Sequence, residues 1–368
     1  MSWFTQQTYA GASEPLPDLV GSYVDEGYLQ LTKLVGVHKT FHVYHALDTT
    51  TDCFVNVKVF RSGVPGSQRA AAIDHEFSLH QAVAAEPGVA TLKSKFTELL
   101  NEREFTVFKL NHADRTMYQS IFHSQVYVDR ANLVRHDFHQ LVAAVRDIHL
   151  LGVHHRDIRP TNVWCNPDGS GVRLANFGMA TQDNQSEDMR TGHTWFMSPE
   201  RVDAATHPTY SPRQDDLWAL ALILFVMITR IHPWNAPLPS DPGYAAFRAD
   251  EANNFIEKFH LTPEANDFFI RCFAPNPADR LSLDDVSVAI RMIDRFTRAR
   301  LGRVYGGACI EPVRPSGTPA ASVAFSLQVP VPVVGVPAAA PFADVRFLDK
   351  DRRSVTTRMR ALKGLRRA

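Results

Sequence analysis

The pattern of apolar and polar positions divides the chain into a β-rich front and a helical rear. Three short segments rich in β-branched and aromatic residues, YLQLTKLV, FHVYHALD and CFVNVKVF, lie between residues 28 and 60 and are separated by turn-like stretches. They predict an antiparallel meander. In AAAIDHEFSLHQAVAA, the residues Ile73, Phe77, His80 and Ala84 recur at helical spacing, and a further strand pair is predicted in VATLKSKFTEL and REFTVFKL.

Beyond about residue 130 the apolar positions follow a helical period. The strongest segments are FHQLVAAVRDIHLLG, DDLWALALILFVMITR, EANDFFIRCFA and SLDDVSVAIRMIDRF. A small β-rich part followed by a large α-rich part predicts an α+β, two-lobed body. We expect a flexible leader at 1–24, a folded domain at 25–297 with lobes at about 25–111 and 112–297, and a Pro-, Ala- and Val-rich linker with a basic tail at 298–368.

Charge and composition exclude several classes of protein. The chain has 39 Lys and Arg against 39 Asp and Glu, so no overall field selects nucleic acid as a specific partner. Four widely spaced cysteines without a C-x-x-C pair argue against a disulfide framework. The longest apolar run, Leu217–Ile228, is shorter than the roughly 20 residues that cross a bilayer. We therefore expect no transmembrane segment and a location in the cytoplasm or nucleus. The basic tail is the part that would contact acidic surfaces.

The most informative motif is HRDIRPTN at residues 155–162, followed by NFG at 176–178 and SPE at 198–200. It resembles the catalytic loop of the eukaryotic protein kinase family, H-R-D with Asn five residues after the Asp. The ordered motifs extend the resemblance over about 28–297. Pro160 supports the serine/threonine pattern, and the runs SEDMRTGHTWFMSPE and DDLWALALILFVMITRIHPWN resemble a fungal branch of these kinases. The resemblance implies a two-lobed protein-kinase fold, ATP with Mg²⁺ as cofactors, and a protein substrate or regulated partner protein.

The resemblance also assigns roles to individual residues. Phosphoryl transfer relies on positioning and on cancelling phosphate charge. Asp157 would orient the attacking hydroxyl, Asn162 would hold magnesium, and Lys58 of VNVK would hold phosphates with Glu76 as its partner eighteen positions later. Arg159 stands where serine/threonine kinases usually carry Lys, and its guanidinium can still reach a phosphate. The plainer interpretations are surface charges for Lys58 and Glu76, and a local backbone cap for Asp157.

The metal-binding motif departs from the family pattern. The Asp of D-F-G is Asn176 here, so one oxygen ligand remains but its negative charge is lost. If this resembles the loss of one preorganised electrostatic group, it costs about 3 to 4 kcal/mol, or 10² to 10³ in rate. We expect Asn162 and Asn176 to be weak magnesium ligands and catalysis to be weak or absent.

The loop that covers the phosphates departs as well. In an alignment to the family's G-x-G-x-x-G-x-V loop that places Val43 at the final Val, Gly36 occupies the first glycine position. His38 and Phe41 occupy the second and third. Glycine lets backbone amides approach a phosphate closely, and a side chain there obstructs that approach. Asn56 replaces the Ala that packs on adenine. These changes favour a pseudokinase that binds nucleotide weakly through Gly36, Val43, Lys58, Glu76, Asn162 and Asn176. The alternatives are an active serine/threonine kinase and a non-catalytic scaffold.

Other residues match the structural framework of the family. Asp216 matches the buried helix Asp that hydrogen-bonds the catalytic loop, and we expect Glu200 to pair with Arg280. His155 is expected in the core, because neighbouring histidines rarely converge on one metal ion and spacing supplies no third ligand. Three hydroxyl residues between the NFG and SPE motifs would pair with Arg156 if phosphorylated. They are Ser186, Thr191 and Thr194.

Overall fold

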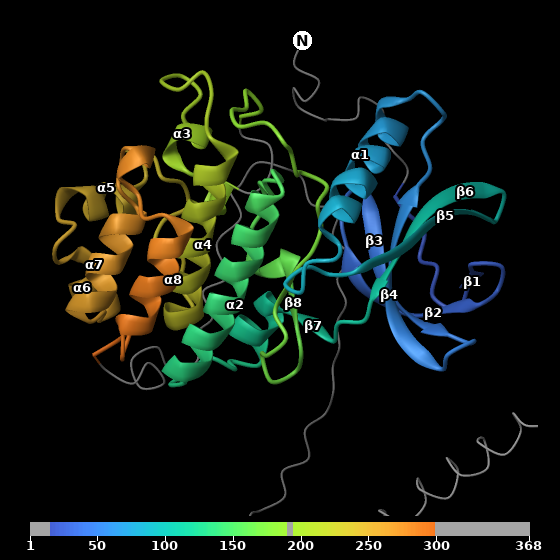
Figure 1. Cartoon of the computed structure of the whole chain (residues 1–368), viewed down its shortest axis with the longest axis horizontal. Helices are drawn as coiled ribbons and strands as arrows, with labels where there is room; N and C mark the ends of the chain where they lie inside the picture. Colours follow the sequence, from blue (N-terminus) through green and yellow to red (C-terminus); the bar gives the residue numbers. More distant parts are fainter. Residues whose placement is uncertain (1–14, 190–193, 299–368) are drawn as a thin grey trace, which may run out of the picture. The chain divides into compact units, whose positions relative to one another are not determined.

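The structure of the protein is a computed structural model that describes residues 15–189 and 194–298 (Figure 1). The Pro-rich linker and basic tail expected at 298–368 lie outside these residues, apart from residue 298. Within the described ranges, no helix combines the length and apolar content needed to span a membrane.

A six-stranded antiparallel sheet forms the front of the chain, in the order β1-β2-β3-β4-β6-β5. The strands are β1 (Tyr23–Val24), β2 (Leu29–Val37), β3 (Phe41–Asp48), β4 (Cys53–Arg61), β5 (Leu92–Leu100) and β6 (Arg103–Asn111). One helix, α1 (Gln68–Val83), follows β4 and lies beside the sheet in Figure 1. Its first turn is capped by Ser67, whose hydroxyl accepts a hydrogen bond from Ala70 N. The meander, the helix and the second strand pair were all predicted.

Residues 15–24 were expected in a flexible leader, and for this part the prediction is wrong. Strand β1 pairs with β2, and Leu19 is only 3% exposed within the sheet's apolar core. The Leu19 amide donates to the Tyr44 hydroxyl over 3.2 Å, and that hydroxyl donates to the Pro17 carbonyl over 3.3 Å. The apolar residues involved are too few to form a repeating pattern, so no strand could be predicted here. Residues 1–14 lie outside the described part of the chain.

The rear of the chain is helical, as predicted. The α-helices are α2 (Ala131–Leu150), α3 (Pro199–Val202), α4 (Pro212–Thr229), α5 (Pro242–Ala249), α6 (Asn254–Phe259), α7 (Pro263–Cys272) and α8 (Leu283–Met292). One short π-helix, η1 (Gln119–His123), precedes α2, and three 3₁₀ turns lie further along the described chain, namely η2 (Pro160–Asn162), η3 (Thr194–Phe196) and η4 (Pro277–Asp279). Helix α4 is buried from Asp215 to Thr229, so it forms the centre of this core rather than one wall of it.

A small second sheet, in the order β7-β8-β9, holds the segments that carry the motifs. Its strands are β7 (Arg115–Thr116), β8 (Val163–Cys165) and β9 (Arg173–Leu174). The HRDIRPTN loop runs from α2 to β8, and NFG follows β9. The Ala175 amide donates to the Asn162 carbonyl over 2.9 Å, which holds the two motifs side by side.

Candidate functional site

The loop at 155–162 is anchored from below by Asp216 on α4, which is 1% exposed. One carboxylate oxygen accepts the His155 amide over 2.8 Å and the other accepts the Arg156 amide over 2.7 Å. Arg156 has a φ of +64°, a left-handed conformation that is costly for a residue with a side chain. The predicted role of Asp216 as the anchor of this loop is therefore confirmed.

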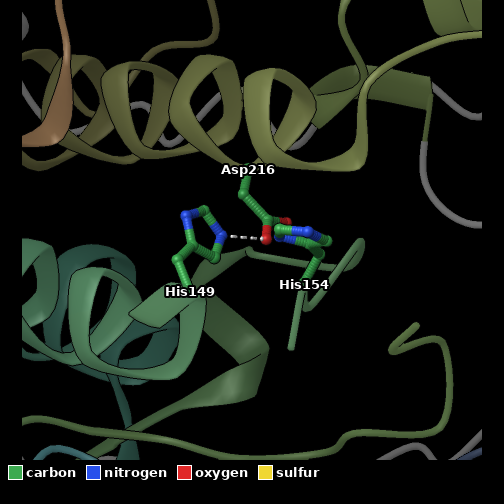
Figure 2. A group of neighbouring side chains, drawn as sticks. All are labelled: His149, His154 and Asp216. Atoms are coloured by element: carbon green, nitrogen blue, oxygen red, sulfur yellow. Dashed lines mark hydrogen bonds and ion pairs between the residues drawn. The ribbon is translucent and has the colours of Figure 1, made fainter. Parts of the chain in front are cut away.

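Two histidines adjoin the same carboxylate, as Figure 2 shows. His149 Nε2 lies 2.8 Å from Asp216 Oδ2, and one atom from each of His149, His154 and Asp216 lies within 4.8 Å of the others. Both oxygens of Asp216 already accept hydrogen bonds, so we interpret the cluster as a structural anchor. Sequence spacing missed it because His149 lies on α2 and Asp216 on α4, far apart along the chain.

Asp157 is held by contacts to both of its carboxylate oxygens. Asn162 Nδ2 donates to Asp157 Oδ2 over 2.6 Å and to the Asp157 carbonyl over 2.7 Å. Arg159 Nε lies 3.0 Å from Asp157 Oδ1 as an ion pair. The Asp157 amide in turn donates to His155 Nδ1 over 3.2 Å. Asp157 is thus fixed in orientation by Asn162 and Arg159, rather than acting as a cap for nearby amides.

Lys58 on β4 and Glu76 on α1 meet as a buried ion pair. Lys58 Nζ donates to Glu76 Oε1 over 2.5 Å, and the two residues are 5% and 4% exposed. Burial lowers the pKa of Lys58, and the Glu76 charge opposes that shift. This burial rules out the interpretation of Lys58 and Glu76 as independent surface charges.

Asn176 completes this group of side chains through two hydrogen bonds. Its Oδ1 accepts from Lys58 Nζ over 2.8 Å, and its Nδ2 donates to Asn162 Oδ1 over 3.1 Å. Asn176 has a φ of +68°, and Gly178 follows where an added Cβ would lie 3.0 Å from Glu76 Oε2. The NFG turn therefore packs closely against the Lys58–Glu76 pair, and a larger residue at 178 would push on the Glu76 carboxylate.

The donor set does not fit a tightly held magnesium ion. Mg²⁺ favours oxygen ligands in near-octahedral geometry, usually with one or two carboxylates. Here the oxygen of Asn162 accepts from Asn176, and the oxygen of Asn176 accepts from Lys58. Both predicted ligands are neutral, and the nearby carboxylate of Glu76 is paired with Lys58.

The Phe41 ring covers Lys58 from the glycine-loop side, and the His38 ring stacks on Phe41. Lys58 Nζ lies 3.7 Å from the centre of the Phe41 ring, and His38 stacks on Phe41 with ring centres 4.1 Å apart. Burial and the adjacent Lys58 charge lower the pKa of His38 to about 4, so the imidazole is neutral at pH 7. The sequence predicted obstruction by His38 and Phe41, but not that Phe41 would lie directly on the ammonium group.

The space left between these groups is small. The cavity has a volume of about 30 Å³, whereas ligand sites typically measure roughly 300 to 1,000 Å³. Its lining comprises His38, Phe41, Val43, Lys58, Glu76, His80, Phe108, Leu110, Thr161, Asn162, Trp164 and Asn176.

Three other residues of the predicted nucleotide site lie on the sheet. Gly36 on β2 pairs with Val43 on β3, and a Cβ at Gly36 would lie 3.3 Å from Val43 Cβ. Asn56 is 3% exposed on β4 between its partners His45 and Leu110. The structure thus brings Val43 to the cavity but places Gly36 and Asn56 outside its lining.

The predicted ion pair between Glu200 of the SPE motif and Arg280 is present. Arg280 donates to both oxygens of Glu200, over 2.6 and 2.8 Å, and both residues are buried. A second buried pair lies nearby, where Arg201 Nη1 is 2.5 Å from Asp215 Oδ2. These ion pairs fasten the SPE segment to α4 and to the loop before α8.

The two-lobed fold and these motifs define the class of protein as protein-kinase-like. Residues 29–289, more than two thirds of the chain, match the model of the protein kinase domain, and the chain therefore belongs to the protein kinase family.

Several relatives are serine/threonine kinases, many of them fungal. The chain is 24% identical over 303 residues to "Negative regulator of sexual conjugation and meiosis" of Schizosaccharomyces pombe, covering 77% of this chain and 63% of that protein. It is 29% identical over 173 residues to "Serine/threonine-protein kinase ksp1" of the same organism, covering 46% and 36%. It is 28% identical over 277 residues to "Inactive serine/threonine-protein kinase PLK5" of Mus musculus, covering 73% and 43%. The chain thus spans less than two thirds of the length of each of these relatives.

Proposed function

We propose that this member of the protein kinase family is a pseudokinase of the serine/threonine type. In this proposal it binds ATP weakly, transfers phosphate slowly or not at all, and acts on a partner protein through its surface. The observation that carries the proposal is the hydrogen bond from Asn176 to Asn162, which joins the two predicted metal ligands as neutral amides. A divalent ion would have to displace this bond without gaining a charged ligand from Asn176.

The covering of Lys58 supports the same proposal. The family in general uses ATP with Mg²⁺, and Lys58 would hold the phosphates. Here its ammonium group is enclosed by Glu76, Asn176 and the Phe41 ring. A phosphate could reach Lys58 only after the Phe41 ring moved away, and this movement would weaken nucleotide binding.

The enzymatic alternative, an active serine/threonine kinase, also has specific support. The Lys58–Glu76 pair is assembled, and Asp157 is oriented by Asn162 and Arg159. In such an enzyme Asp157 would accept the proton of a Ser or Thr hydroxyl, and Asn162 and Asn176 would act as neutral metal ligands.

The experiment that separates these functions is a thermal-shift titration of the protein with ATP, with and without Mg²⁺ or Mn²⁺. Ligand that binds the folded state raises the melting temperature by mass action. The pseudokinase proposal predicts a small shift that hardly changes with metal, and little radiolabel transferred to protein. A large metal-dependent shift, with transfer abolished in Asp157→Ala, would support the active enzyme instead. If millimolar ATP did not shift the melting temperature, a non-catalytic scaffold would be the remaining function.

A further inference from the structure

The segment between the NFG and SPE motifs carries a carboxylate that contacts the arginine of the HRD motif. Arg156 Nη2 lies 2.6 Å from Asp188 Oδ2 and also donates to the Asp188 carbonyl over 3.3 Å. The Nε of the same guanidinium donates to the Tyr210 hydroxyl over 2.7 Å. Arg156 thus uses both Nε and Nη2 to hold Tyr210 and Asp188.

All three groups are buried. Arg156, Asp188 and Tyr210 are 6%, 8% and 2% exposed. A second guanidinium, Arg201, donates to the Arg156 carbonyl over 2.7 Å but is balanced by its own partner Asp215. Asp188 thus supplies the negative charge that compensates Arg156, and a buried arginine that loses its partner is strongly destabilising.

The local backbone presents Asp188 to Arg156. Ser186 and Tyr210 exchange two backbone hydrogen bonds, of 2.9 and 3.0 Å, as an isolated bridge. The Ser186 hydroxyl accepts the Asp188 amide over 3.1 Å and closes a short turn. Ser186 is itself only 8% exposed, so this hydroxyl is poorly placed for modification.

We propose that Asp188 permanently occupies the place where a phosphorylated side chain would pair with Arg156. A phosphate that orders such a segment acts by pairing with arginine. Here the carboxylate forms that pair already, so residues 186–189 are ordered in the unphosphorylated protein and do not respond to phosphorylation. This inference goes beyond the proposed function and holds whether or not the protein binds nucleotide.

Hydrogen exchange tests the proposal on the full chain, without nucleotide. The protein would be produced in bacteria, treated with phosphatase and checked by mass spectrometry for the absence of phosphate. We expect slow exchange of the amides of Ser186, Asp188 and Tyr210 in this wild-type protein. In Asp188→Asn, which keeps the shape but removes the charge, we expect exchange at least about tenfold faster. Glu187→Gln is the matched control, because Glu187 is exposed beside Asp188.

Two results would overturn the proposal. One is equal exchange in Asp188→Asn and Glu187→Gln. The other is rapid exchange of residues 186–189 in the unphosphorylated wild-type protein, which needs no variant and so remains decisive if Asp188→Asn fails to fold. Neither readout involves ATP, so a failure here is distinguishable from a failure of the pseudokinase proposal.

Discussion

The two sides of the catalytic loop differ in how they handle charge. On the side of α4, here called the framework side, Asp216 accepts hydrogen bonds from two backbone amides of the loop. Glu200 is paired there with Arg280 at 2.6 and 2.8 Å. On the side of the loop that faces Lys58, the predicted metal ligands Asn162 and Asn176 are neutral and hydrogen-bond each other over 3.1 Å. The framework side holds buried charges that have hydrogen-bond or ion-pair partners, whereas the side of the predicted nucleotide site has a neutral amide at a position that carries a carboxylate in active kinases.

This difference shows that the fold and the chemistry have separate electrostatic requirements. The charges of the framework are compensated within the protein itself, so they stabilise the fold without any ligand. A carboxylate at position 176 could still accept a hydrogen bond from Lys58 Nζ, but its second oxygen would face the amide oxygen of Asn162 and offer it no donor. Asn176 therefore fits a site without bound metal, because its Nδ2 donates a hydrogen bond to Asn162 Oδ1.

The largest expected effect comes from breaking the framework side. Glu200→Gln would leave the Arg280 guanidinium buried beside a neutral amide, and we expect the free energy of unfolding to fall by about 3 to 5 kcal/mol. Equilibrium unfolding in urea measures this change. Glu264→Gln, in an exposed first turn of α7, is the control and should change stability by less than about 1 kcal/mol. Equal losses in the two variants would contradict the framework role of Glu200.

Acid should lower the stability that the buried, neutral His80 contributes beside the predicted nucleotide site. Burial lowers the pKa of His80 to about 4 from 6.5, so the unfolded chain binds more protons between these values. Stability from neutral His80 is complete above pH 6.5 and is lost as the pH falls toward 4, by about 2 kcal/mol between pH 7 and pH 5. Hydrogen bonding to His149 keeps the pKa of Asp216 low despite its burial, so the anchor stays charged in this window.

Urea unfolding at pH 7 and pH 5 tests this pH dependence. His80→Gln removes the titrating group and keeps a donor for the Ala90 carbonyl, which His80 Nε2 contacts at 2.6 Å. We expect this variant to lose less stability on acidification than the wild type does. His207→Gln, at an exposed position, should behave as the wild type. An unchanged acid loss in His80→Gln would show that other groups are responsible.

A smaller effect should follow from uncovering Lys58. Phe41→Gly removes the ring that lies 3.7 Å from the ammonium group and restores the residue that the family carries at this position. Because a desolvated cation–π contact contributes up to about 2 kcal/mol, we expect ATP to bind about tenfold more tightly. Calorimetric titration without metal measures this affinity. Phe41→Tyr keeps the ring and should bind as the wild type does; a gain in both variants would rule out the covering role.

Much of the fold was predictable because its signals are local. Short segments rich in β-branched and aromatic residues predicted β2, β3 and β4, and helical spacing predicted α1 and α2. The motifs in their order indicated the buried roles of Asp216 and of the Glu200–Arg280 pair. Segments without a repeating pattern were missed, among them β1 and the short strands β7 and β9, because two residues cannot show a period.

The site was predictable in composition but not in arrangement. The sequence identified Lys58, Glu76 and Asn176 as members of one site, and the structure shows that they touch. It could not show that Phe41 lies on Lys58 or that Asp188 binds Arg156, because both contacts depend on how separate segments fold back. An acidic residue in the segment before SPE was the available signal for the second contact.

The central claim, that the neutral amide of Asn176 is what prevents tight metal-dependent nucleotide binding, is tested most directly by Asn176→Asp. The measurement is the ATP-induced thermal shift of this variant and of the wild type, each with and without Mg²⁺. We predict a nearly metal-independent shift in the wild type and a clear Mg²⁺-dependent increase in Asn176→Asp, in line with the roughly 10² to 10³ contribution of one preorganised charged group. A strong Mg²⁺-dependent shift already present in the wild type, or none gained in Asn176→Asp, would contradict the claim.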